Sequence, residues 1–308
     1  MSARCGDDPL VGEIVAEVIG EPRANVPLRL FAGANYLVLA GRAPAYTGAL
    51  DPWPAFRAIL EAKRSWLRRF VTEQPVQTNE VRRSWGLLPG FLAAAAAAPG
   101  RPLDLVELGP SGGLNLLLDR YHFRYGEGEW GVSDSALALA GRERGRVPAG
   151  LLGTPLEVRG RIGIDRQPVD VASEHGALLL QAFVWADEPE RLERVRRAIA
   201  MARRAPPELL AGDYLELLPE LLSRRRADGL TVVFSSNSTE YLDDASYGRL
   251  AEAIEAAGRR APLAWVSAEP PRERRASGYV LELQLWPGGE RRRLARVHYH
   301  GAWIDWIA

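Results

Sequence analysis

The chain has 308 residues, with 39 basic and 39 acidic side chains and no formal net charge. A hydrophobic content of 47% with 25% charged residues is typical of a soluble globular protein with a sizeable core. No apolar stretch approaches the ~20 residues of a membrane span, no signal peptide is expected, and Cys5 alone forms no disulfide framework. These features predict a cytoplasmic protein without a membrane partner.

Almost all basic residues are arginine, and Lys63 is the only lysine. The balanced charge disfavours a nucleic-acid partner, because nucleic-acid binders usually present a net basic face. The absence of a Gly-Lys pair excludes a phosphate-binding P-loop. We therefore expect a small-molecule substrate and no nucleic acid, while the oligomeric state stays open.

Residues 1–100 are expected to form a helical region. Apolar residues recur at three- and four-residue spacing over 11–19 and 53–70, and residues 28–39 are apolar on almost every side. A further helix is expected over 84–98, broken or kinked near Pro89 and Gly90. Because prolines and a glycine follow at 99–102, we place a boundary near residue 100 and interpret the helical part as a cap or lid.

Residues 101–308 alternate between strand-like and helical patterns, which predicts an α/β fold with a Rossmann-like, mostly parallel sheet. Two adjacent strands near the end, around the turn at 287–289, predict a closing antiparallel hairpin. The expected strands lie at 103–108, 161–165, 208–211, 230–234, 262–266, 279–286 and 293–299, and the expected helices at 191–203, 213–222 and 247–257.

The richest motif is LVELGPSGGLN at 105–115, a strand that runs into a glycine-rich turn and then a helix. Such a turn places a ligand against backbone N–H groups at a helix N-terminus. A dinucleotide fingerprint would need glycine where Ser111 and Leu114 stand, so that interpretation fails.

The same turn, GPSGG at 109–113, matches the G-x-S-x-G elbow of serine hydrolases. This alternative predicts Ser111 as the nucleophile, with a triad completed by one acid and one histidine, chosen from Asp213, Asp243, His298 and His300. The helical character of 1–100 disfavours it, because a hydrolase sheet supplies several strands before the elbow. A buried acid at Glu107 would also be an unexplained cost.

The motif resembles the first motif of class I S-adenosylmethionine-dependent methyltransferases, an acid followed by glycines at alternate positions. Here Glu107 is the acid, and Ser111 replaces the middle glycine between Gly109 and Gly113. In that family the acid orients the turn and the cationic methionine part of the cofactor. The resemblance covers residues 101–308 and implies cofactor contacts from Glu107, Gly109, Ser111, Gly113, Asn115, Asp165, Asp213 and Ser235.

Further segments resemble later parts of the same fold, in the right order. Asp165 follows a second strand as the acid that binds the ribose hydroxyls, Asp213 follows a third strand as the acid that faces adenine, and Ser235 opens the loop after the fourth strand. Asp165 lies 56 residues beyond Gly109 rather than about 20, so we interpret 121–160 as an insertion. The alternative places the second strand at 121–125 and the ribose acid at Glu127 or Glu129.

The whole chain also resembles a bacterial family of uncharacterised function, through VQTNEV at 76–81, GLNLLLDRY at 113–121 and HGAW at 300–303. This resemblance brings no known substrate. It implies a methyltransferase-like fold, in agreement with the glycine-rich motif.

The expected reaction is methyl transfer from S-adenosylmethionine to a small molecule. Glu80, Glu240 and His300 are the candidate bases if the acceptor must lose a proton. The polar run at 77–80 is either a helix cap or a contact to cofactor or substrate. His298 and His300 are expected on one face of a strand, as structural histidines, a general base or, with Asp305, a metal pair; we assign no metal. A non-catalytic nucleoside-binding or interaction protein is the competing class.

Overall fold

The computed structural model describes residues 2–21, 25–48, 50–126, 128–272 and 278–308. The chain divides into two compact units. One, here the helical unit, contains the chain up to Thr78 together with Val169–Ile199; the other, here the α/β unit, contains Asn79–Pro168 and Ala200–Ala308. No helix in the described ranges has the length and apolar character needed to cross a membrane.

This division differs from the boundary expected near residue 100. Helix α6 (Arg83–Ala97) packs on strands of the α/β unit, and the segment 169–199 returns to the helices of the first unit. A break or kink was expected near Pro89 and Gly90; α6 runs through both residues, so the break is wrong. Gly90 has a packing role instead, because a Cβ there would lie 2.8 Å from Val266 Cγ1.

Helix α3 (Val26–Leu39) of the helical unit is largely buried, as its apolar sequence predicts. The other helices of this unit are α1 (Ser2–Asp7), α2 (Pro9–Val15), α4 (Trp53–Ala62), α5 (Arg64–Glu73), α8 (Glu174–Ala182) and the first part of α9 (Pro189–Arg204). Asn35 of α3 donates hydrogen bonds to the carbonyl oxygens of Ala182 (3.1 Å) and Val184 (3.0 Å). These bonds tie the returning segment to the N-terminal helices.

The α/β unit is built on a large sheet in the order β5-β12-β11-β10-β9-β8-β1-β6-β7. Five neighbouring strands are parallel: β7 (Glu208–Ala211), β6 (Val158–Asp165), β1 (Leu103–Leu108), β8 (Leu230–Ser236) and β9 (Leu263–Glu269). Strands β10 (Tyr279–Trp286), β11 (Glu290–Val297) and β12 (Trp303–Trp306) continue the sheet antiparallel, and β5 (Arg142–Gly145) ends it. The predicted fold class is confirmed.

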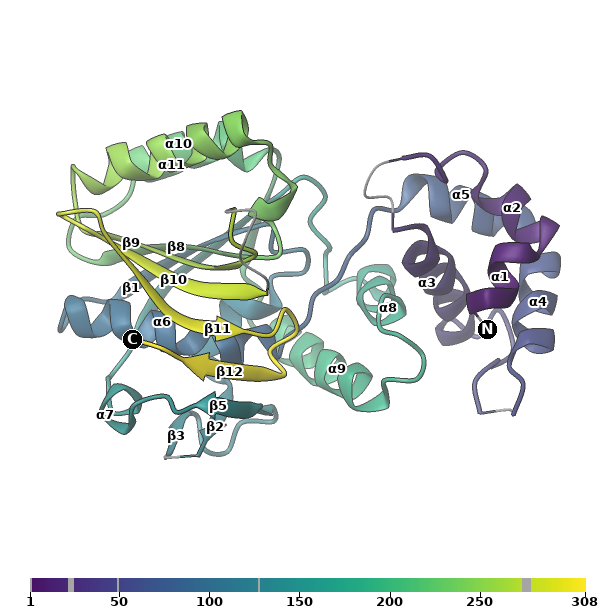
Figure 1. Cartoon of the computed structure of the whole chain (residues 1–308), viewed down its shortest axis with the longest axis horizontal. Coiled ribbons are helices and arrows are strands. Elements are labelled where there is room, and N and C mark those ends of the chain that lie inside the picture. The colour runs from purple at the N-terminus through teal and green to yellow at the C-terminus, as the bar shows by residue number, and fades with distance from the viewer. Residues whose placement is uncertain (1, 22–24, 49, 127, 273–277) are drawn as a thin grey trace. The chain divides into compact units, whose positions relative to one another are not determined.

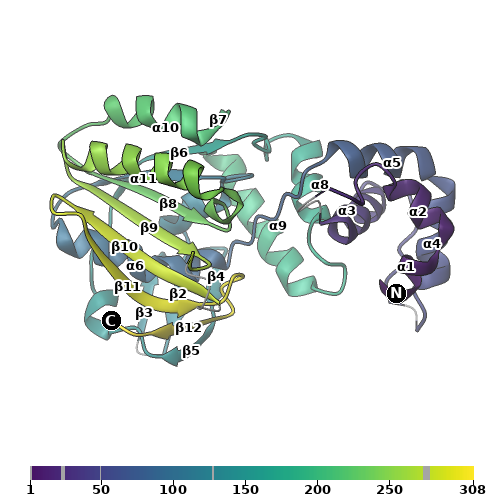
Figure 2. The same ribbon diagram turned by 45° about the horizontal axis from the view of Figure 1, so that its top comes forward.

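Helices cover both faces of this sheet (Figures 1 and 2). Helices α10 (Tyr214–Ser223) and α11 (Asp244–Gly258) cover one face, where Tyr247 packs on Trp265. Helix α6 covers the other face, against Val266. Trp265 and Val266 are neighbours on β9, and successive side chains of a strand point to opposite faces.

The chain between β1 and β6 makes a long detour. It passes through the 3₁₀ helix η1 (Leu114–Arg120), a small sheet in the order β3-β2-β4, strand β5 and the short helix α7 (Ala149–Leu152). The small sheet contains β2 (His122–Tyr125), β3 (Gly128–Gly131) and β4 (Ala138–Ala140). The second strand beside β1 is thus β6, with Val106 opposite Ile162, and not the segment 121–125.

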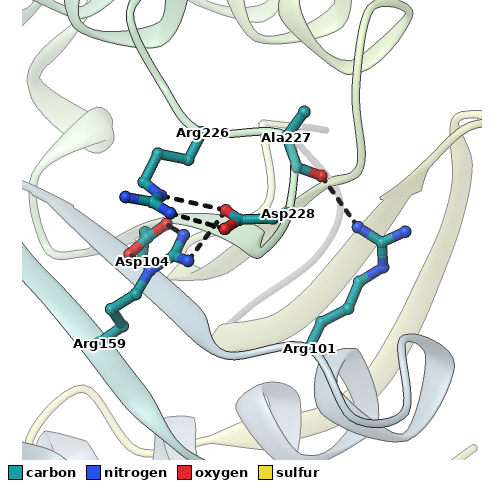
Figure 3. Close-up of polar contacts among 6 residues, drawn as sticks. All are labelled: Arg101, Asp104, Arg159, Arg226, Ala227 and Asp228. Carbon is teal, nitrogen blue, oxygen red and sulfur yellow. Dashed lines mark hydrogen bonds and ion pairs between the residues drawn. The ribbon is translucent and has the colours of Figure 1, made fainter.

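Charged side chains tie the amino ends of the parallel strands together, at the edge opposite the glycine turn (Figure 3). Arg159 of β6 contacts Asp104 of β1 (3.0 Å) and Asp228 (2.9 Å), which lies just before β8. Arg226 also binds Asp228, at 2.7 Å, and the two guanidinium groups hold the pKa of Asp228 far below its ordinary range. Arg101 donates to the carbonyl oxygen of Ala227 (3.0 Å).

Candidate functional site

The glycine-rich turn follows β1 at the point where the strand order reverses. Strands β6 and β7 continue on one side of β1, and β8 and β9 on the other. In open α/β sheets, ligands bind outside the carboxyl ends of the strands at such a switch point. The fold therefore directs attention to the residues just after β1, β6 and β8.

Three residues of the turn have left-handed backbone conformations: Gly109 (φ 71°), Ser111 (φ 55°) and Gly113 (φ 71°). Glycine adopts this region without strain, and the two glycines are also needed for space. A Cβ at Gly109 would lie 2.5 Å from Ser238 Oγ, and one at Gly113 would lie 2.7 Å from Pro207 Cγ. The turn therefore packs tightly against the loop after β8 and the segment before β7.

Asp165, the last residue of β6, holds this turn in place. Its Oδ2 accepts a hydrogen bond from Ser111 N (2.8 Å), and its Oδ1 accepts one from Gln167 N (2.9 Å). Each carboxylate oxygen has a second lone pair, so Asp165 keeps acceptor capacity for a ligand. Of the two alternative ribose acids, Glu129 lies on β3 in the small sheet, and Glu127 lies outside the described residues.

Glu107 is buried on β1, with 3% of its surface exposed. Burial raises its pKa to about 8; Asp165 adds to this rise, while the Arg83 guanidinium and the Asn115 amide oppose it. Its Oε2 atom has no hydrogen-bond partner among the described residues. A buried acceptor without a partner is uncommon in proteins and points to a missing donor.

The segment before α6 reaches the glycine turn. Asn79 donates from Nδ2 to the carbonyl oxygen of Pro110 (2.6 Å), and Ser84 donates to Asn115 Oδ1 (2.8 Å). No side chain caps the start of α6, so the helix-cap alternative for the run at 77–80 is wrong. Glu80 is buried, and its Oε1 accepts from Arg82 N (3.0 Å).

The C-terminal turn joins the same edge of the sheet. Arg82 donates to the carbonyl oxygen of His300 (3.1 Å), and Arg83 donates to that of Tyr299 (3.0 Å). Gly301 is required by this contact, because a Cβ there would lie 2.0 Å from Arg82 O. The three segments that the sequence singles out, 76–81, 113–121 and 300–303, thus contribute residues to one connected region.

The two C-terminal histidines are not on a strand, so the expectation that they share a strand face is wrong. They lie in the turn between β11, which ends at Val297, and β12. Gly301 N donates to His298 O (2.8 Å), which closes the turn, and His300 N donates to His298 Nδ1 (3.0 Å). Burial, with Arg82 and Arg144 nearby, lowers the pKa of His298. The described residues contain no cluster of three or more potential metal ligands.

Asp213 follows β7 and caps α10. It accepts from Leu215 N (2.9 Å) and pairs with Arg166 (2.7 Å). Burial alone would raise its pKa, but the Leu215 amide and the Arg166 guanidinium hold it below its ordinary range. Gly212 N donates to Asp165 O (2.9 Å), so the ends of β6 and β7 are adjacent.

The loop after β8 is held by an acid that the sequence patterns did not reveal. Glu269, the last residue of β9, accepts from Ser238 N (3.0 Å) and Thr239 N (3.1 Å) through Oε1. Ser235 is fully buried on β8, and Glu240 accepts from Tyr279 Oη (3.1 Å). The available signal was an acid at the end of a strand, the same position that marked Asp165.

The family model described as "Uncharacterized protein conserved in bacteria (DUF2332)" matches residues 2–306. The chain belongs to this family. No curated protein matches it. Because the DUF2332 description names no reaction, the chemistry of the site has to be argued from its geometry.

The hydrolase alternative needs an acid to orient a histidine beside Ser111. In this DUF2332 protein both candidate acids are helix caps: Asp213 binds Leu215 N and Arg166, and Asp243 accepts from Ser246 N (2.7 Å). The Nδ1 atom of His298, where such an acid would bind, accepts from His300 N instead. The left-handed conformation of Ser111 suits an elbow, but these contacts do not form a triad.

Proposed function

We propose that the α/β unit binds S-adenosylmethionine at the carboxyl ends of β1, β6 and β8 and transfers its methyl group to a small molecule. The observation that carries this proposal is the pair Glu107 and Asp165. They lie at the ends of adjacent strands, beside a left-handed glycine turn, at the switch point of the sheet.

The residues at this edge fit the chemical groups of that cofactor. The unpartnered Oε2 of Glu107 is suited to the cationic methionine part, because a buried carboxylate is stabilised by a nearby positive charge. Asp165 retains lone pairs for the ribose hydroxyls. Ser111 in place of the middle glycine is compatible with the turn, since Asp165 holds its backbone N–H in the left-handed conformation.

The bound cofactor would supply an electrophilic methyl group on a sulfonium. The protein would supply position: Glu107 and Asp165 hold two parts of the cofactor, and the turn residues Gly109 and Gly113 allow close approach of the backbone. In-line placement of a nucleophile accounts for much of the rate of such a transfer. A base near the acceptor completes the requirements.

Calorimetric titration with S-adenosylhomocysteine tests the proposal. We expect micromolar binding to the wild type, loss of binding in Asp165→Ala and Asp165→Asn, and unchanged binding in Glu129→Ala. Glu129 is the matched control, because it is an exposed acid on the separate small sheet. Circular dichroism on each variant checks that the fold is retained.

A wild type that does not bind would overturn the proposal. The hydrolase alternative then predicts that a fluorophosphonate labels the wild type and spares Ser111→Ala. Binding that survives in both Asp165 variants and is lost in Glu129→Ala would keep the cofactor but reassign its ribose contact.

A further inference from the structure

A polar cavity of about 370 Å³ lies on the face of the sheet that α11 covers, at the carboxyl end of β9. Strands β9, β10 and β11 form one wall, and α11 with the 3₁₀ helix η2 (Thr239–Tyr241) forms the other. Its volume is within the range of small-molecule sites. We call it the β9–β11 pocket.

Glu269 lies at one end of this pocket. It is 9% exposed, and the two backbone N–H groups of the β8 loop occupy only its Oε1. Its Oε2 accepts no hydrogen bond from the described residues. The loop that Glu269 holds is the same loop whose Ser238 packs on Gly109, so this end of the pocket lies next to the glycine turn.

The surroundings of Glu269 favour a cation at this end. Burial raises its pKa, the Ser238 and Thr239 amides and the Ser235 hydroxyl oppose the rise, and the nearby Glu240 carboxylate increases it. The phenols of Tyr214, Tyr241 and Tyr279 lie within the electrostatic range of this carboxylate, and the Arg83 guanidinium lies within range of Tyr241 and Tyr279. Two carboxyl groups at one site repel each other unless a proton or a cation lies between them.

The opposite end of the pocket, at β11, carries Arg291 and Arg293, and Arg272 lies at Tyr247. Arg272 lies over the ring, 4.3 Å from its centroid, and Arg291 reaches the hydroxyl at 3.4 Å. Arg272 pairs with the exposed Asp244 (2.7 Å) and also donates to the carbonyl oxygens of Thr239 (3.4 Å) and Leu242 (3.0 Å), so it is held at the segment that Glu269 binds. Arg291 shares Glu282 with Arg293. This end is suited to an anionic group.

We infer that the β9–β11 pocket binds the methyl acceptor, and that the acceptor is a primary amine carrying an anionic group several bonds away. Only the role of this ligand as the methyl acceptor rests on the proposed function. Glu269 and Glu240 would bind the ammonium end, and Arg291 the anionic end. Across β10, Arg291 lies level with Trp265, four residues before Glu269 on β9, so a ligand that joins the two ends needs a chain of several bonds.

In the transfer, one ammonium N–H proton passes to Glu269 Oε2 and frees the nitrogen lone pair. The new N–C bond forms as the C–S bond of S-adenosylmethionine breaks, and that bonding pair stays on sulfur. The products are the methylated amine and S-adenosylhomocysteine. Glu269 is thus the base of the reaction, in place of Glu80 and His300, and Glu240 assists by charge.

Binding of three matched probes without cofactor tests the inference: 6-aminohexanoate, hexanoate without the amine, and hexylamine without the carboxylate. We expect 6-aminohexanoate to bind the wild type about tenfold more tightly than either analogue, because each lost charge pair weakens binding. In Glu269→Gln, 6-aminohexanoate should bind no more tightly than hexanoate. In Arg291→Gln, 6-aminohexanoate should bind no more tightly than hexylamine. Gln at position 269 keeps the acceptor for the β8 loop.

Two controls match these variants. Glu252→Gln neutralises an exposed acid of α11, and Arg292→Gln neutralises the arginine between Arg291 and Arg293; neither residue lines the pocket. Both should leave all three affinities unchanged. A wild type that does not prefer 6-aminohexanoate, or a preference that survives in Glu269→Gln, would overturn the inference.

S-adenosylhomocysteine titrations separate this inference from the proposed function. If the probe pattern holds and S-adenosylhomocysteine does not bind, the pocket is an amine site and methyl transfer is wrong. If S-adenosylhomocysteine binds and the probe pattern fails, the methyl acceptor binds elsewhere. If the probe pattern holds and S-adenosylhomocysteine also binds, Glu240→Gln should shift the pH at which kcat reaches half its plateau. This shift is expected because the base Glu269 is coupled to the Glu240 carboxylate.

Discussion

The side-chain amide of Asn79 donates a 2.6 Å hydrogen bond to the carbonyl oxygen of Pro110. Asn79 precedes α6, and Pro110 lies in the middle of the glycine turn, so this bond holds a polar segment from outside the sheet against the proposed cofactor site. Both residues are in the α/β unit. The turn is therefore held from two directions, by Asn79 and by Asp165.

Asn79→Asp should weaken the turn more than Asn79→Ala. Aspartate replaces the donor with a carboxylate that faces the Pro110 carbonyl oxygen, whereas alanine only removes the bond. A buried hydrogen bond lost in this way costs about 1–3 kcal/mol of unfolding free energy. Urea unfolding measures that loss, and S-adenosylhomocysteine titration should show weaker binding in the same order. Equal stability of both variants and the wild type would contradict the role given to Asn79.

Glu107→Gln should change how stability depends on pH. The pKa of Glu107 is raised from 4.5 to about 8, so between these values the folded chain holds a proton that the unfolded chain releases. The unfolding free energy of the wild type should therefore fall as pH rises through this window, by at most ~1.4 kcal/mol per pH unit. Glu107→Gln should lack this contribution. Parallel stability curves for the two proteins from pH 5 to pH 8 would show the pKa is not raised.

Ligand affinity should rise with pH as Glu107 ionises, whereas the unfolding free energy falls. The ammonium group of S-adenosylhomocysteine is bound best by the ionised form of Glu107, which is the minor form at pH 7 and the major form at pH 9. The affinity for S-adenosylhomocysteine should rise about tenfold over that interval, relative to Glu107→Gln. The comparison with Glu107→Gln removes the pH effects that do not involve Glu107. An identical pH dependence in both proteins would place the ligand away from Glu107.

Gly109→Ala should destabilise the α/β unit through two effects. The left-handed φ costs a residue with a Cβ about 1–2 kcal/mol, and the new Cβ would meet Ser238 Oγ. Adding Ser238→Gly removes the clash but leaves the backbone strain, so the double variant should recover only part of the lost stability. Thermal melts of the single and double variants measure this. Full recovery would mean that the backbone at position 109 is not strained.

Arg159→Gln should lower the melting temperature without changing ligand binding. It removes the link between Asp104 and Asp228 at the amino ends of the strands (Figure 3). Because these groups are partly exposed, the difference from the wild type should shrink as salt is added. S-adenosylhomocysteine affinity should stay the same, since the proposed site lies at the opposite edge of the sheet. A loss of affinity at unchanged stability would contradict that assignment.

Local patterns were sufficient to predict most of the sheet. The strands at 103–108, 161–165 and 230–234 are apolar runs next to turn residues, and the parallel core built from them agrees with their expected order. The spacing after Gly109 counted against Asp165, and Asp165 was preferred over Glu127 or Glu129 because the segments 191–203 and 212–213 follow it in the expected order. These features depend on residues close together in the sequence.

Other features depend on contacts that no local pattern reveals. The helical period of 191–203 is correct, but nothing in it indicates that the first part of α9 packs in the helical unit. A break or kink was expected near Pro89 and Gly90, yet α6 runs through both residues, and Gly90 lies against Val266 and Leu281. Glu269 follows the same rule as Asp165, but no glycine motif precedes it, so only the hydrogen bonds to the β8 loop reveal its role.

The chain passes between the two units three times, near residues 78, 168 and 199. A deletion of the N-terminal helices would therefore remove the packing partners of α8, where Leu179 and Leu180 are buried. The remaining fragment would expose these side chains in the middle of its sequence and would be prone to aggregation. Because each unit consists of two separate chain segments, neither unit can be expressed as a single continuous fragment.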